Sequence, residues 1–566
     1  MYSLVVRNGT LVDGTGLASY RADVGVRGDR IAAIGRIRER GAQEIDAEGH
    51  VVTPGFIDAH THLDAQLFWD PLATSSCWHG VTTAVVGNCG FTLAPSKDGE
   101  RELVLRNLER AEDIPAESMA AGVPWGWERF TEFLDALDTI PKAVNVAAYL
   151  GHSALRTWAM GERAFDEPAS EDDLTLMASE LADALRAGAV GFSTSRSGNH
   201  RTSDDRPVAS RIATWDEVVA LVGELARSGG GIFQLANESA MASADADARA
   251  ESMGRLRQLA VSTGVPTTFG VTTFGDPRRW RELLDLIDDT AAAGGRMFGQ
   301  SSGRESGVLY SFQTWLPYDE MPVWSGVRSR PLDEQLRALR DPVTRQRLVD
   351  AARDGTYSLG GGPQRPVDYD RIFAVEQMIR PNPSIADLAA APGIEPVEVV
   401  IDLAVESELA QFFAFVTGNA DPSDLKTILQ HPRTVMTFSD SGAHVSQLIN
   451  ASLPTHLLAY WTREQELFTI ERAVQMLTLV PATAWGFPDR GLVREGFVAD
   501  LNVFDPARVA PDLPVVADDF PAGAKRLKQT ATGFLATVVS GEVALRHGEH
   551  TGAHPGVLIR RRSLPS

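Results

Sequence analysis

The middle of the chain alternates short apolar segments with longer helical patterns, and this alternation restricts the fold more than any other feature. Eight apolar segments of strand length end in polar residues or glycine: GFIDAHTH (55–62), VTTAVVGNCG (81–90), AVNVAAYLGH (143–152), AVGFSTSR (189–196), GIFQLANES (231–239), PTTFGVTTF (266–274), GRMFGQSS (295–302) and TVMTFSDSG (434–442). Helical patterns lie between several of them, such as 170–188, which begins with a Ser-x-x-Asp cap and ends at glycine. Continuous apolar strands that alternate with helices indicate a parallel sheet. Eight of them predict an α/β fold built on a (β/α)8, TIM-like barrel.

The two ends of the chain differ from the middle, because they carry short strand patterns joined by glycine turns. Residues 2–14 place Asn-Gly between two apolar runs, which is a strong hairpin signal, and residues 496–506 and 536–549 have the same character. We therefore predict a small β-sandwich domain formed by both termini, from residues 1–54 and 487–550.

The predicted barrel covers residues 55–486 and carries an insertion within about 303–433, between its last two strands. The insertion includes a glycine cluster, SLGGGPQRP (358–366), which lacks the Lys-Ser/Thr tail of a phosphate loop, so we expect a plain loop there. Residues 551–566 form a C-terminal tail, whose basic end we expect to be frayed.

Composition limits the partners and the compartment. The formal net charge of −22 argues against binding to nucleic acid or to an anionic membrane, both of which need basic patches. Only two cysteines, Cys77 and Cys89, favour a reducing compartment. No signal peptide begins the sequence and no apolar stretch reaches the length of a membrane span. We expect a cytoplasmic protein that acts on a small molecule; whether it forms a homo-oligomer is left open.

Metal-compatible side chains fall at the ends of three of the predicted strands. His60 and His62 end the first strand, Cys89 ends the second and Asp440 ends the eighth. Side chains two apart on a strand share a face, and chemistry in such barrels sits where the strands end. A lone His-x-His pair is a weak signal, but the coincidence of four residues predicts a metal site formed by His60, His62, Cys89 and Asp440. Asp440 is also predicted to be a catalytic proton acceptor.

Five further residues are candidates for contact with the substrate. His152 ends the third strand and is predicted to be a catalytic donor to an oxyanion. Arg196 and Arg201 follow the fourth strand and are predicted to bind a substrate carboxylate, with a surface charge as the alternative for each. His200, in the same loop, and His444, shortly after the eighth strand, complete the predicted substrate-binding residues.

Several motifs run nearly from end to end, over about residues 3–510. They are PGFIDAHTHLD, HGVTTAVVGNCG, LGHSALR, GFSTS, SDSGAH and PATAWGF followed by DRGLVREGFVADLNVFDP. Together they resemble the amidohydrolase superfamily, specifically its N-acyl-D-amino-acid deacylase (D-aminoacylase-like) branch. The resemblance implies a zinc-bearing (β/α)8 barrel with a small β domain from both termini, and hydrolysis of the amide bond of N-acylated amino acids. It also implies that His60 and His62 are metal ligands, that Cys89 replaces the bridging carboxylated lysine of other branches, and that Asp440 is the catalytic aspartate.

Two positions depart from the pattern of that branch. Its members carry metal-binding histidines after the fifth and sixth strands, whereas this chain has Ala236 and Val271 there, and neither segment contains a histidine. A lysine of the family that helps to hold a substrate carboxylate falls at Thr273. We therefore predict the loss of one of the two family metal sites, and one Zn²⁺ per chain.

The sequence as a whole predicts a metal-dependent hydrolase of non-peptide amide bonds. The favoured reaction is deacylation of an N-acyl amino acid or a related N-acyl compound, by metal-activated water with Asp440 as the base. The alternatives on the same barrel are a lactonase, a cyclic-amide hydrolase or a carbon–carbon bond hydrolase. A metal-free, non-catalytic homologue is a further alternative, against which the retained His60, His62 and Asp440 argue.

Overall fold

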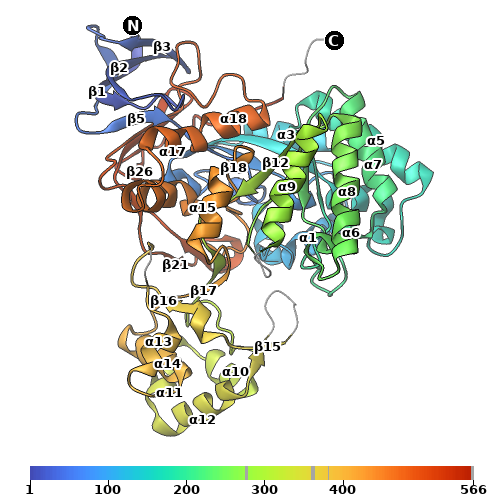
Figure 1. Ribbon diagram of the computed structural model, residues 1–566, viewed down its shortest axis with the longest axis vertical. Helices are drawn as coiled ribbons and strands as arrows, with labels where there is room; N and C mark the ends of the chain where they lie inside the picture. The colour runs from blue at the N-terminus through green and yellow to red at the C-terminus, as the bar shows by residue number, and fades with distance from the viewer. Residues whose placement is uncertain (274–277, 358–363, 380–381, 562–566) are drawn as a thin grey trace.

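The computed structural model describes residues 1–273, 278–357, 364–379 and 382–561, and a barrel of eight parallel strands forms its centre (Figure 1). The strands are β6 (Phe56–Asp58), β7 (Val81–Val86), β8 (Asn145–Gly151), β9 (Gly191–Ser195), β10 (Ile232–Ala236), β11 (Thr267–Gly270), β12 (Met297–Ser301) and β18 (Thr434–Met436). They pair in chain order from β6 to β18, and a parallel bridge between Thr61 and Ser441 joins the first strand segment to the last. The predicted TIM-like barrel is therefore confirmed, with one strand in each of the eight apolar segments.

Helices cover the outside of the barrel, among them α5 (Glu171–Ala187), α7 (Trp215–Arg227) and α8 (Ala246–Thr263) (Figure 1). α5 begins at the predicted cap: the Ser170 hydroxyl accepts from the Asp173 backbone N–H, and the Asp173 carboxylate accepts from that of Ser170. α7 buries Val218, Leu221, Val222 and Leu225, a stripe at helical spacing that packs into the main apolar core.

Strands from both termini form one mixed sheet beside the barrel (Figure 1). Within the described residues this sheet has nine strands. Five come from the N-terminal part: β1 (Tyr2–Leu11), β2 (Tyr20–Arg27), β3 (Arg30–Gly35), β4 (Gly41–Asp46) and β5 (Val51–Pro54). Four come from the C-terminal part: β19 (Leu501–Phe504), β24 (Phe534–Val539), β25 (Glu542–Arg546) and β26 (Glu549–His550). The two parts meet where β5 pairs antiparallel with β19, and residues of both parts share one apolar core. Both ends of the chain therefore build the small β domain.

The segment between β12 and β18 folds into a subdomain that projects from the barrel (Figure 1). Its described residues up to β17 contain a sheet of β13 (Ser306–Tyr310), β16 (Ile372–Ala374) and β17 (Phe413–Gly418), and five α-helices: α10 (Pro322–Arg328), α11 (Leu332–Arg340), α12 (Pro342–Arg353), α13 (Ile385–Ala390) and α14 (Pro396–Glu406). These elements share an apolar core of their own around Trp324. Of the glycine cluster, residues 358–363 lie outside the described residues, and Arg365–Pro366 form the short strand β15.

The C-terminal tail packs against the barrel as far as Arg561, whereas most of the basic end that was expected to be frayed lies outside the described residues. The backbone N–H groups of Gly556 and Ile559 donate to the carbonyls of Lys142 and Val146. Leu558 is buried in the main core, so the tail gains apolar burial as well as hydrogen bonds. Residues 562–566 lie outside the described residues.

No helix of the described residues could cross a lipid bilayer, because none combines sufficient length with an apolar composition. The longest of those described, α8, has 18 residues but includes five charged side chains, namely Asp247, Arg249, Glu251, Arg255 and Arg257.

Candidate metal centre

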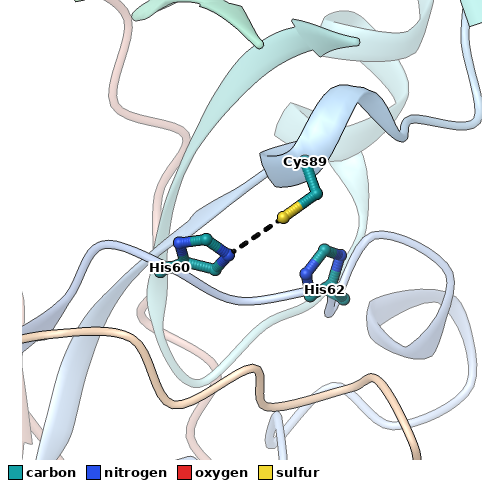
Figure 2. A group of neighbouring side chains, drawn as sticks. All are labelled: His60, His62 and Cys89. Atoms are coloured by element: carbon teal, nitrogen blue, oxygen red, sulfur yellow. Dashed lines mark hydrogen bonds between the residues drawn. The ribbon is translucent and has the colours of Figure 1, made fainter. Parts of the chain in front are cut away.

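Three buried side chains, His60, His62 and Cys89, converge at the mouth of the barrel (Figure 2). Their candidate ligand atoms all lie within 4.8 Å of one another. The Cys89 Sγ is 3.3 Å from the His60 Nε2, and the centroids of the two imidazole rings are 5.6 Å apart. The structure thus brings together the three residues that the sequence placed at the ends of the first two strands.

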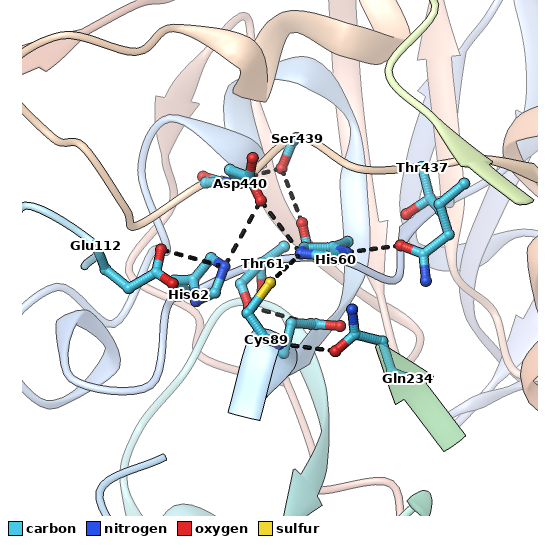
Figure 3. Close-up of polar contacts among 12 residues, drawn as sticks. His60, Thr61, His62, Cys89, Glu112, Gln234, Thr437, Ser439 and Asp440 are labelled. Atoms are coloured by element: carbon cyan, nitrogen blue, oxygen red, sulfur yellow. Dashed lines mark hydrogen bonds and ion pairs between the residues drawn. The ribbon is translucent and has the colours of Figure 1, made fainter. Parts of the chain in front are cut away.

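Asp440 joins this cluster from the loop after β18 (Figure 3). Its Oδ1 lies 3.2 Å from the His60 Nε2 and 3.6 Å from the His62 Nε2. The backbone holds the two loops together, because the Asp440 N–H donates to the His60 carbonyl and the His62 N–H donates to the Ser441 carbonyl. Asp440 adopts a φ of 53°, a left-handed conformation that aspartate tolerates better than most residues. The carboxylate therefore has a defined place beside both imidazoles.

The sharp turn after β7 brings Cys89 into the cluster. Cys89 has a φ of 56° and Gly90 a φ of 81°. A Cβ atom at Gly90 would lie 2.9 Å from the backbone nitrogen of Ser195, so only glycine fits at this close approach to β9. The Cys89 N–H donates to the Gln234 Oε1 at 2.7 Å, which fixes the turn against β10.

A glutamine on β12 orients His60. The His60 Nδ1 lies 2.6 Å from the Gln300 Oε1, while the Gln300 Nε2 donates to the Thr268 hydroxyl. With its amide group held in this way, the Gln300 Oε1 accepts a hydrogen bond from the His60 Nδ1–H, which leaves Nε2 as the nitrogen that can bind a metal. The sequence argument missed Gln234 and Gln300, although each is a polar residue within an apolar strand segment, which is a signal that identifies such partners.

Glu112 is a further residue that the sequence argument missed. It lies just after α1 (Arg101–Glu109), and its Oε2 is 3.5 Å from the His62 Nε2 (Figure 3). Burial, together with the nearby carboxylates of Asp440 and Asp64, raises the pKa of Glu112 well above its ordinary value. Because it lies in neither a barrel strand nor a recognisable motif, no pattern in the sequence pointed to it.

Burial and the neighbouring charges set the pKa values of the residues in the cluster. Enclosure raises the pKa of Asp440, but the adjacent imidazoles of His60 and His62 lower it by a larger amount, so that the pKa lies well below its ordinary value. Burial raises the pKa of the Cys89 thiol, and the charges of Glu112 and Asp440 add to this effect. Burial also lowers the pKa of His62, which favours its neutral, ligating form. A bound divalent cation would reverse the cost of ionising the thiol and the carboxylates.

Unpaired buried atoms provide a test of whether these residues suit a metal. Four buried atoms have no hydrogen-bond partner among the described residues: the two ring nitrogens of His62, the Oε1 of Glu112 and the Nε2 of Gln234. Buried polar atoms are normally paired, so this group of unpaired atoms at one place requires an explanation. Two imidazoles and a thiol form a donor set typical of zinc. The residues present therefore fit a zinc ion.

The cluster forms one wall of a cavity of about 520 Å³. Residues after β9 and β10, including His200 and Asn237, line it together with Trp280 and Leu283 of α9 (Arg279–Ala292). A second cavity of about 780 Å³ shares Asp440 and His444 with the first and extends to Trp315 of the insertion subdomain. A molecule bound beside Asp440 and His444 could therefore extend one part into each cavity.

The model of the amidohydrolase family matches residues 43–544 of the chain. The chain belongs to the amidohydrolase family. It is 28% identical to a D-aminoacylase of Alcaligenes xylosoxydans xylosoxydans over 565 residues, which cover 99% of this chain and 98% of that protein. The crystal structure of N-acyl-D-glutamate deacylase from Bordetella bronchiseptica, complexed with zinc and a phosphonate inhibitor, has a TM-score of 0.66 at 25% identity and covers 99% of both chains. A structure of D-aminoacylase with a binuclear metal centre also has a TM-score of 0.66 at 25% identity, over 99% of this chain and all of that one.

In this amidohydrolase His152 lies away from the metal cluster, which corrects its predicted catalytic role. The chain enters α4 (His152–Met160) at this residue, so the side chain packs between β9 and α7. Its Nδ1 lies 2.9 Å from the Thr194 hydroxyl and its Nε2 lies 2.9 Å from the Glu217 Oε1. Both ring nitrogens are therefore occupied by buried partners, and His152 is fully enclosed.

The two predicted substrate-binding arginines of the amidohydrolase have other partners. The Arg196 Nε pairs with the Glu238 Oε1 at 3.0 Å, and Arg201 pairs with Asp205 at 3.3 Å. Neither arginine lines the cavity, because ion pairs hold each in the loops around it, whereas Arg279 of α9 does line it. The alternative interpretation, a surface charge, agrees with the partly exposed Arg201, whereas Arg196 forms a largely buried ion pair with Glu238.

His200 and His444, the other two predicted substrate-binding residues, line the cavity. The Nδ1 of His200 is 2.7 Å from the Ser195 hydroxyl. Enclosure lowers the pKa of His200 to about 3, so the imidazole is neutral at physiological pH. A neutral imidazole at this place can donate or accept a hydrogen bond but carries no charge.

Ala236 and Val271, which stand where the deacylases carry metal-binding histidines, have different surroundings. Ala236 ends β10 and lines the cavity, whereas Val271 is fully buried after β11. Thr273 exchanges two hydrogen bonds with Asn419, at 2.9 and 2.7 Å, and so ties the loop after β11 to the end of the insertion. None of these three side chains can bind a metal as a histidine does.

Proposed function

We propose that this amidohydrolase removes the acyl group from an N-acyl amino acid, or from a related N-acyl compound, by hydrolysis of the amide bond. One observation carries the proposal: the Asp440 carboxylate lies 3.2 Å from His60, at the edge of a His60–His62–Cys89 cluster that opens into a cavity. The likeness to D-aminoacylase and to N-acyl-D-glutamate deacylase over almost the whole chain supports amide bonds as the target.

Each residue of the centre has a role in this reaction. A zinc ion held by His60, His62 and Cys89 would supply Lewis-acid activation of water and of the substrate carbonyl. Asp440 takes a proton from the attacking water, and its depressed pKa keeps it ionised for that purpose. It then returns the proton to the nitrogen as the carbon–nitrogen bond breaks, which yields a carboxylic acid and an amine.

The two cavities suit a substrate with an acyl arm and an amino-acid arm, because they meet at Asp440 and His444. Arg279 lines the cavity of about 520 Å³, and Arg110 lines the cavity of about 780 Å³. Arg279 is our candidate for holding a substrate carboxylate, because its cavity also contains the His60–His62–Cys89 cluster. Trp280 and Leu283 add apolar surface beside it. The substrate is thus a small molecule with one charged and one uncharged side.

One zinc ion per chain is part of the proposal. The positions after β10 and β11 carry Ala236 and Val271, so the ligands of a second, histidine-rich site are absent from the described part of these segments. The donors that remain all face one point at the mouth of the barrel. A mononuclear site therefore agrees best with the residues present.

The test is the substitution Asp440→Asn in zinc-loaded protein. Asparagine tolerates the left-handed backbone of this position, so the fold should be kept. We expect the rate of deacylation of the best N-acyl amino acid to fall by about 10²- to 10⁴-fold, the usual contribution of a general base. The substrate panel should contain N-acetyl amino acids of both configurations, lactones, cyclic amides and β-diketones. Full activity of the variant, or hydrolysis of lactones, cyclic amides or diketones alone, would contradict the proposal.

A further inference from the structure

We propose that Glu112 is a ligand of the metal ion, in addition to His60, His62 and Cys89. The inference rests on the proposed zinc site and names one more residue that holds the ion. Glu112 comes from the segment after α1 rather than from a barrel strand. It would supply a carboxylate oxygen on the side of His62.

The first argument is the state of the carboxylate itself. The Glu112 side chain is 4% exposed, and its Oε1 has no hydrogen-bond partner among the described residues. Its Oε2 lies 3.5 Å from the Nε2 of His62, whose two ring nitrogens are also without hydrogen bonds. A buried carboxylate and a buried imidazole that face each other without a hydrogen bond are costly, unless a cation lies between them.

The second argument is the spacing of the donor atoms. Two donors bound to one tetrahedral zinc ion are about 3.3–3.7 Å apart, given zinc–ligand distances of about 2.0–2.3 Å. The Glu112 Oε2 is 3.5 Å from the His62 Nε2, which falls within this range. The Cys89 Sγ and the His60 Nε2 are 3.3 Å apart. This spacing relates Glu112 to His62 alone, because Glu112 is not among the three residues whose donor atoms all lie within 4.8 Å of one another. To bind the same ion, the Glu112 carboxylate would have to move towards His60 and Cys89.

The third argument is the way in which the backbone fixes Glu112. Its N–H donates to the Leu108 carbonyl, which continues the last turn of α1. Its carbonyl accepts from the His444 N–H at 2.5 Å, in the loop that also carries Asp440. The segment after α1 is thus tied to the metal-binding loops, so the carboxylate is held in place rather than free to turn towards solvent.

A carboxylate ligand at this position has a consequence for Asp440. When Glu112 supplies an anionic oxygen to the ion, Asp440 is not needed to complete its coordination. Asp440 then remains available for proton transfer, although it lies beside the same histidines.

The substitution Glu112→Gln tests the inference, because it keeps the shape and removes the anionic donor. Zinc affinity is measured by competition with a chromophoric chelator, for the wild-type protein and the variant. The visible spectrum of the cobalt(II) form gives a second readout, independent of activity. We expect the affinity to fall by at least about tenfold, since even outer partners of metal ligands change it 10- to 100-fold, and the cobalt bands to change. The thiolate-to-cobalt band should persist, because Cys89 is untouched.

Two further variants separate the explanations. Asp113→Asn removes the same charge one residue away, where the carboxylate contacts Ser446 and Gln447, and should leave the zinc affinity unchanged. Glu112→Asp keeps the carboxylate and should retain part of the affinity, and it replaces the glutamine variant if that protein fails to fold. Unchanged affinity in Glu112→Gln would mean that Glu112 is only a buried, protonated acid. An equal loss in Asp113→Asn would mean a general charge effect, and either result overturns the inference while leaving the zinc site in place. Wild-type protein that binds no zinc would overturn the inference and the proposed function together.

Discussion

The Nε2 of His60 lies 3.2 Å from the Oδ1 of Asp440, although one residue follows the first barrel strand and the other the last. The closure of the barrel makes this contact, because the bridge between Thr61 and Ser441 sets the two strand ends side by side. The metal cluster therefore lies across the seam of the barrel, and its geometry depends on that closure.

Replacement of both first-strand histidines should abolish zinc binding. The double variant His60→Ala/His62→Ala removes two of the three donors that lie within 4.8 Å of one another. We expect about one zinc per chain in the wild type, measured by elemental analysis of protein purified without added metal or chelator, and none in the variant. His550→Ala/His554→Ala is a matched control, since these neighbouring rings, 4.8 Å apart, belong to the C-terminal segment and should not affect zinc content. Retention of zinc by the first variant would show that other residues bind it.

Loss of the Gln300 acceptor should weaken zinc binding without removing a ligand. In Gln300→Leu the His60 Nδ1 loses the partner that now lies 2.6 Å away, so the ring is no longer held with Nε2 towards the cluster. The zinc affinity should fall by about 10- to 100-fold, the usual effect of losing such a partner. Gln300→Glu keeps an acceptor oxygen and should retain most of the affinity. An unchanged affinity in Gln300→Leu would show that packing alone orients His60.

Arg279 is expected to bind the carboxylate of the substrate. In Arg279→Gln we expect KM for N-acyl amino acids to rise by about 10- to 100-fold, as for the loss of a charged hydrogen bond worth about 1.5–3 kcal/mol. The kcat value should change little, because Arg279 does not contact the metal cluster. The same substrates with an amidated carboxyl group should show no difference between variant and wild type. The matched change Arg201→Gln, outside the cavity, should have no effect on KM.

The buried pair of Glu217 with His152 and Arg156 should make stability depend on pH. Burial raises the pKa of Glu217, but His152 and Arg156 lower it further, to about 2 from an ordinary value of 4.5. A carboxyl group whose pKa is depressed by folding stabilises the protein fully above pH 4.5, and this contribution is lost as the pH falls towards 2. At neutral pH, Glu217→Gln should lower the free energy of unfolding by about 3 kcal/mol.

Urea denaturation of the metal-free proteins at several pH values measures this effect. The difference in the free energy of unfolding between wild type and Glu217→Gln should be constant from pH 7 to about pH 5 and should become smaller below pH 4. If this difference in the free energy of unfolding became larger on acidification, Glu217 would be protonated in the folded protein.

The position of His152 could not be predicted from the local sequence pattern. The strand that precedes it was predicted correctly, and the residue does follow that strand. The chain, however, turns into α4 at once, and Glu217 of α7 binds the imidazole outside the barrel. Whether a polar residue at a strand end faces the mouth of the barrel or the surrounding helices depends on the next element, and the apolar pattern of the strand does not contain that information.

The sequence by itself determined the eight strands, the shared β domain and the convergence of His60, His62, Cys89 and Asp440. Strand periodicity and the parallel order of a barrel are local or nearly local properties, and they bring strand ends to one face. The tertiary structure alone showed that Glu112, Gln300 and Arg279 lie at the cluster or its cavity; they come respectively after a helix, within a strand and at the start of α9. Their positions follow from long-range packing between segments far apart in the chain, and that packing leaves no periodic trace in the sequence.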